Sequence, residues 1–87
     1  MLAVKRIILD VLKPHQPNAL EFCKAVANAG QDYRVCLTVI EVDEKTESLQ
    51  LEVSGNDIDF DLIQSTISDI GGSIHSIDEV EVQNESV

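Results

Sequence analysis

Apolar and polar residues alternate along the first part of the chain with a period of two, which is the pattern of a half-buried strand. Ile7, Leu9 and Val11 share one face of residues 4–12, and the prolines that follow end the strand because they have no backbone N–H. Other segments show helical spacing or β-branched runs. The predicted elements are a strand at 4–12, a helix at 18–29, strands at 33–42 and 47–54, a helix at 59–70 and a strand at 73–82.

Boundary residues support these elements. Gly30 predicts a left-handed end to the first helix. Asp59 suits the N-cap of the second helix, with Ile58 and Ile63 placed as a hydrophobic staple. The polar residues 43–46 between two strands predict a hairpin.

The order βαββαβ with right-handed crossovers predicts an α+β fold, the ferredoxin-like sandwich. Its four-stranded antiparallel sheet has the order 4-1-3-2 and carries both helices on one face. Residues 1–87 are expected to form a single domain, because a chain of this length supports one two-layer core. Asp78 and Glu79 interrupt the last strand and predict a bulge or an exposed edge, and the tail 83–87 is expected to be frayed.

Charge narrows the classes of partner. The chain has 16 acidic and 6 basic side chains, so its net charge of -10 disfavours nucleic acid and anionic membranes as partners. Residues 1–6 lead directly into a strand, and no apolar run approaches about 20 residues. We therefore expect a cytoplasmic protein.

Other proteins of this fold carry signatures that are missing here. The loop at 13–18 has no Cys-x-x-Cys pair for Cu(I) and no Gly or Arg for a phosphoryl group, and the sheet has few aromatic residues for RNA. Cys23 and Cys36 do not have the spacing of a metal site, which favours two buried, reduced thiols. An enzyme is not expected.

Four acidic residues around the hairpin form the first candidate site. Carboxylates this close in sequence can supply several oxygen ligands to a hard divalent cation, Ca²⁺ rather than Zn²⁺. The alternative is a solvated acidic hairpin. The candidate ligands are Glu41, Asp43, Glu44 and Glu47.

The two histidines suggest a second candidate site. The end of the first strand, the start of the last and the exit of the third are expected to share one edge of the sheet, with the hairpin acids at the opposite edge. Imidazole and carboxylate ligands there would suit Zn²⁺. In the alternative interpretation, His15 caps the strand exit while His75 bonds to Asp10 or Ser76. The candidate ligands are His15, His75, Asp57 and Asp59.

Helices on only one sheet face leave the other face open. A large apolar patch there predicts a homo-oligomer, with Arg6, Lys13 and Arg34 available to meet acids of a neighbouring copy. Pairing through the second or fourth strand is an alternative geometry, and either arrangement can close a ring. The open face is expected to carry Arg6, Ile8, Asp10, Leu12, Thr38, Ile40 and Val42.

Three segments resemble the archaeal proteins known as domain of unknown function 211. They are LDVLKPH at 9–15, EVDEKTE at 41–47 and GGSIHSIDEV at 71–80. The resemblance implies a ferredoxin-like fold, an archaeal source, a symmetric homo-oligomer and a divalent cation such as calcium. It implies no established activity.

The leading hypothesis is a non-catalytic, homo-oligomeric, cation-binding protein with a regulatory role. A second hypothesis is a sensor that binds an amino-acid-like small molecule between subunits near residues 13–18. A third, an enzyme built on His15, His75 and Asp10, lacks an obvious nucleophile or phosphate loop.

Overall fold

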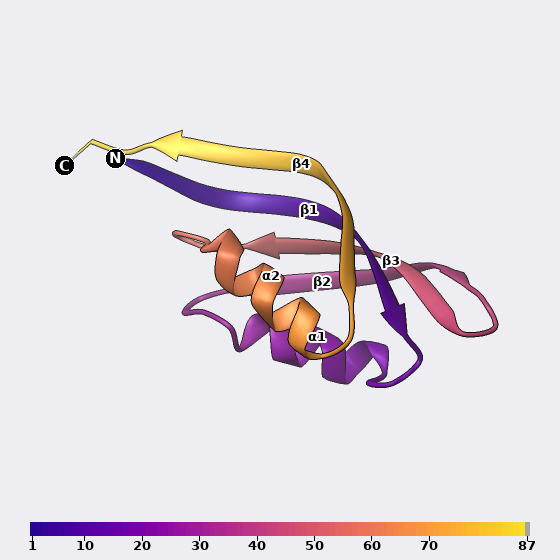
Figure 1. Ribbon diagram of the computed structural model, residues 1–87. Helices are drawn as coiled ribbons and strands as arrows, with labels where there is room; N and C mark the ends of the chain where they lie inside the picture. Colours follow the sequence, from indigo (N-terminus) through magenta and orange to yellow (C-terminus); the bar gives the residue numbers. More distant parts are fainter. Residues whose placement is uncertain (87) are drawn as a thin grey trace.

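The computed structural model describes residues 1–86 and contains the expected elements in the expected order. Neighbouring strands are antiparallel in the order β2-β3-β1-β4, and both helices lie on one side of the sheet (Figure 1). This confirms the ferredoxin-like α+β arrangement. The elements are β1 Leu2–Pro14, α1 Ala19–Ala27, β2 Arg34–Val42, β3 Thr46–Ser54, α2 Phe60–Asp69 and β4 Ser73–Asn84.

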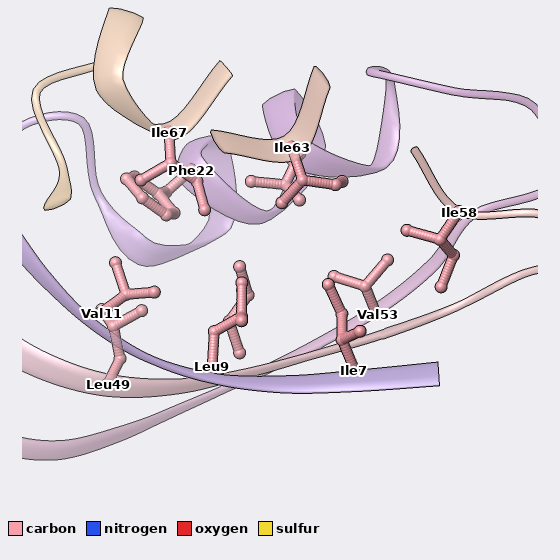
Figure 2. Close-up of a cluster of buried hydrophobic side chains, with 11 residues drawn as sticks. Ile7, Leu9, Val11, Phe22, Leu49, Val53, Ile58, Ile63 and Ile67 are labelled. Atoms are coloured by element: carbon pink, nitrogen blue, oxygen red, sulfur yellow. The ribbon is translucent and has the colours of Figure 1, made fainter. Parts of the chain in front are cut away.

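The core lies between the central strands and the helices. Ile7, Leu9 and Val11 of β1 are buried, and each pairs with a buried apolar residue of β3, so both strands present one continuous apolar face. Figure 2 shows these side chains pointing from the sheet toward the helices. The residues that meet them from the helices are Phe22, Val26, Ile63 and Ile67.

The last strand is long and irregular. Its pairing with β1 skips Asp78, which confirms a bulge at that point. The pairing continues to Asn84 opposite Leu2, and the Glu85 N–H donates to the Met1 carbonyl at 2.7 Å. The strand therefore extends into the segment expected to be frayed, while Val87 lies outside the described residues.

The turn after α1 differs from the prediction. Gly30 does not have the expected left-handed backbone, and the residue with positive φ is Asp32, at 61°. A side chain at Gly30 would instead collide with the ring of Tyr33, because its Cβ would lie 2.3 Å from Cζ. The Tyr33 hydroxyl accepts a hydrogen bond from the N–H of Asp59, the confirmed N-cap of α2. Packing under an aromatic ring, and not helix termination, therefore accounts for this glycine.

Candidate functional site

The histidine site predicted from sequence does not form. β1 is antiparallel to β3, so the end of β1 lies beside the start of β3 and not beside its exit, with Pro14 opposite Thr46. His15 therefore lies beside the hairpin. Asp57 and Asp59 follow the exit of β3, where the next residues bond to the beginning of β1. The prediction that placed these acids with His15 and the hairpin at the opposite edge was wrong.

Lys13 is the most unusual residue at the hairpin end. Its side chain is fully buried, because it follows Ile7, Leu9 and Val11 on the helix-facing side of β1. Its Nζ lies 3.0 Å from Glu47 Oε1 and 2.8 Å from the carbonyl oxygens of both Pro14 and Pro17. An ammonium group has three protons to donate, so all of them have acceptors. The expectation that Lys13 would meet acids of a neighbour was therefore wrong.

His15 joins the same carboxylate from the loop after β1. Its Nδ1 lies 2.9 Å from Glu47 Oε2, and its Nε2 lies 2.9 Å from the carbonyl oxygen of Glu44. Both neighbours are acceptors, so only the imidazolium form can donate to both. The bond to Glu47, assisted by the Glu44 carbonyl, raises the pKa of His15. The bonds from His15 and Lys13 lower the pKa of Glu47.

These contacts restrict the metal chemistry of this end of the sheet. Each oxygen of Glu47 is already bonded to a cationic side chain, and a doubly donating His15 has no lone pair for a metal ion. Lys13, His15 and Glu47 therefore form a structural unit, which we term the Glu47 clamp. Lys13 was not predicted as a member, although it lies in phase with the buried residues Ile7, Leu9 and Val11 along β1.

The remaining hairpin acids are exposed. The hairpin is closed by the Asp43 N–H, which donates to the Thr46 carbonyl at 2.8 Å. The side chains of Glu41, Asp43 and Glu44 face solvent around this turn. Within residues 1–86, no group of three or more His, Cys, Asp or Glu residues is arranged to hold a metal ion.

His75 lies apart from His15, on a second irregularity of β4. It lines a shallow cavity of about 250 Å³ on the open sheet face, together with Asp10, Leu12 and Ser48. The expected hydrogen bond to Asp10 or Ser76 is not formed, and the Ser76 hydroxyl donates to Asp78 instead at 2.6 Å. The two histidines therefore do not form one site.

The open face is more polar than expected. Arg6 pairs there with Glu52 and, at 2.9 Å, with Glu79, so this guanidinium is used within the chain. A register shift at Ile40 places Val42 opposite Glu47, on the helix-facing side and not on the open face. The assignment of Val42 to an open apolar patch was therefore wrong.

Exposed apolar side chains gather at the two edge strands instead. On β2, Ile40 and Val42 are each 64% exposed, and on β4, Val80 is 54% exposed. These strands each pair on one side only, because β2 contacts β3 and β4 contacts β1. The edge residues concerned are Val39, Ile40 and Val42 on β2, and Ile77, Val80 and Val82 on β4.

The two cysteines are free thiols in different environments. Cys23 is half-buried, its Sγ lies 3.5 Å from the Val35 carbonyl, and burial raises its pKa. Cys36 is exposed, because its position opposite Glu52 puts it on the open face. The expectation of two buried thiols was therefore wrong for Cys36.

This topology defines a small α+β protein of the ferredoxin-like class. Residues 5–87 match the family DUF211, described as uncharacterized ArCR. The chain is also 42% identical over 80 residues to uncharacterized protein MJ0319 of Methanocaldococcus jannaschii, covering 92% of this chain and 82% of that relative. The chain belongs to the DUF211 family, which confirms the resemblance of its three motifs. Neither helix within residues 1–86 has the length and apolar character needed to cross a bilayer.

Proposed function

We propose that this protein is a non-catalytic homo-oligomer that assembles edge to edge and binds a divalent cation. The observation that carries the proposal is the exposure of apolar side chains on both edge strands, Val39, Ile40 and Val42 on β2 and Ile77, Val80 and Val82 on β4. An unpaired strand edge already offers a row of backbone donors and acceptors to another chain. The apolar side chains at both edges would be buried by that pairing, and their removal from water would stabilise it further.

Strand direction makes the two edges compatible. β1 and β2 both run antiparallel to β3, and β4 runs antiparallel to β1. Copies in the same orientation can therefore place β4 of one beside β2 of the next as antiparallel strands. Arg34, exposed at the start of β2, would then lie toward the end of β4, which carries Glu81. A contact between two different surfaces is heterologous, and such contacts form a ring when the rotation between successive copies closes and an open filament when it does not.

The cation belongs to the hairpin in this proposal. Glu41, Asp43 and Glu44 offer oxygen ligands, which suit Ca²⁺ better than Zn²⁺, and the nearby imidazole of His15 is engaged by two acceptors. Because one chain does not gather three such ligands among its described residues, a second copy would complete the site. A bound cation would also relieve repulsion between acidic surfaces brought together by assembly.

The sensor hypothesis has less support. The loop at 13–18, where its ligand was expected, already uses the carbonyls of Pro14 and Pro17 to hold Lys13.

We also propose a regulatory role and a cytoplasmic location. The free thiols of Cys23 and Cys36 support the location, because thiols stay reduced in the cytoplasm.

Native mass spectrometry of the purified chain tests assembly. We expect a closed oligomer for the wild type and monomers for Val80→Lys, because a buried lysine at the edge would lose its hydration. Leu62→Lys is the matched control, since Leu62 is 48% exposed but lies on α2 and not on an edge strand. A monomeric wild type, or equal assembly of both variants, would contradict the edge-to-edge arrangement.

The same spectra recorded with added Ca²⁺ or Zn²⁺ test the cation. We expect about one Ca²⁺ per chain, lost when Glu41, Asp43 and Glu44 are all replaced by their amides. A control triple variant, with amides at the exposed acids Asp57, Asp61 and Asp69, changes the net charge equally and should retain binding. Equal loss in both variants would show a diffuse charge effect and not a site.

A further inference from the structure

We propose that Lys13 and His15 are positioning residues that hold the β2 edge in the conformation a second copy recognises. The inference rests on the proposed edge-to-edge assembly and identifies the residues that prepare one of its two surfaces. They act through Glu47, whose carboxylate both of them bind.

Glu47 occupies a position from which it can control β2. It lies directly opposite Lys13 of β1 on one side and Val42 of β2 on the other. Val42 is one of the exposed apolar residues of the proposed interface. Fixing Glu47 between β1 and β2 therefore fixes the backbone that presents Val42.

The end of β2 has little other support. Ile40 and Val42 remain mostly exposed, and the register shift at Ile40 interrupts regular pairing. β2 is also an edge strand, which pairs with β3 on one side only. The hairpin tip is held from outside the hairpin by His15, whose Nε2 lies 2.9 Å from the Glu44 carbonyl.

Ordering the hairpin before assembly would strengthen association. A surface that is already in its bound conformation does not lose further conformational freedom when the partner arrives. The clamp supplies that order through bonds from Lys13 and His15 that lie behind the exposed edge, so the apolar side chains stay available to the partner.

The test compares the full chain with His15→Phe, which keeps a planar ring but removes both donors. Gln64→Phe is the control, because Gln64 is exposed and lies on α2, not on either edge strand. Three quantities are measured for each protein. They are amide hydrogen exchange at residues 43–47, the protein concentration at half-assembly and the midpoint of thermal unfolding.

We expect His15→Phe to exchange about tenfold faster at residues 43–47 and to need an about tenfold higher concentration for half-assembly, with the control unchanged. Its unfolding midpoint should fall by only a few degrees, because His15 lies outside the core. His15→Gln, whose side-chain NH₂ group can still donate a hydrogen bond, should recover part of both losses.

Faster exchange with unchanged assembly would overturn the positioning role, and so would unchanged exchange. A large fall in the unfolding midpoint that accounts for the assembly loss would also overturn it, by assigning His15 to stability alone. If the wild type is monomeric at every concentration, the proposed assembly fails, and hydrogen exchange still shows separately whether the clamp orders the hairpin.

Discussion

The two ends of β1 are each held by a lysine and a glutamate, yet the two pairs differ in burial. At the hairpin end, the side chain of Lys13 is 0% exposed and that of Glu47 is 17% exposed. At the other end, Lys5 lies 3.0 Å from Glu85 Oε1 and 2.7 Å from the Asn56 carbonyl, with Lys5 21% and Glu85 43% exposed. The bond lengths are similar, but only Lys13 has lost its contact with water.

Burial changes what each pair does for the fold. A charge that has been removed from water must be satisfied by protein groups, so loss of one partner leaves the others uncompensated. A pair near the surface can exchange its partner for water at little cost. The hairpin end is therefore expected to depend on Lys13, whereas the terminal end should tolerate changes at Lys5.

Replacing Lys13 by methionine should have the largest effect. The variant keeps most of the side-chain volume but leaves the Pro14 and Pro17 carbonyls without their donor, and we expect a loss of about 3 kcal/mol in the free energy of unfolding. Urea unfolding measures this loss. Lys5→Met serves as the control, and equal losses in the two variants would show that burial is not what separates the two ends.

The second-largest effect is expected in the pH dependence of stability, which should report the charged groups at the hairpin end. The folded-state pKa of His15 is raised from 6.5, so its contribution is complete below about pH 6.5 and is lost as pH rises through the folded value. The folded-state pKa of Glu47 is lowered from 4.5, so its contribution is complete above about pH 4.5 and is lost as pH falls through the folded value. The clamp should therefore contribute most between these limits.

Urea unfolding of the wild type and His15→Phe at several pH values tests this expectation. The difference in stability should be largest near about pH 5.5 and should shrink as the pH rises through the raised folded-state pKa of His15, because the imidazole then loses its charge. A difference that stays constant across this range would show that His15 acts through packing and not through its charge.

Period-two alternation in the sequence predicted β1 and its buried face, because side chains of a strand alternate between its two sides. The same phase also places Lys13 on the buried face, but a lysine is ordinarily assigned to solvent, so the clamp was not predicted. The register shift at Ile40 leaves no clear trace in composition, and it moved Val42 to the other face. The separation of His15 from Asp57 follows from the antiparallel pairing of β1 and β3, which puts the end of β1 beside the start of β3. The prediction used the order of the strands but placed their ends without regard to strand direction.

The smallest effect on stability should come from the ion pair between Lys5 and Glu85, at the end of β1 opposite the hairpin. Glu85→Gln removes the carboxylate near Lys5, which keeps its bond to the Asn56 carbonyl, so we expect a loss below about 1 kcal/mol that added salt reduces further. Urea unfolding at low and high salt measures it. A larger, salt-independent loss would mean that the closing bond from the Glu85 N–H to Met1 depends on this side chain, and that the two ends of β1 are held in the same way after all.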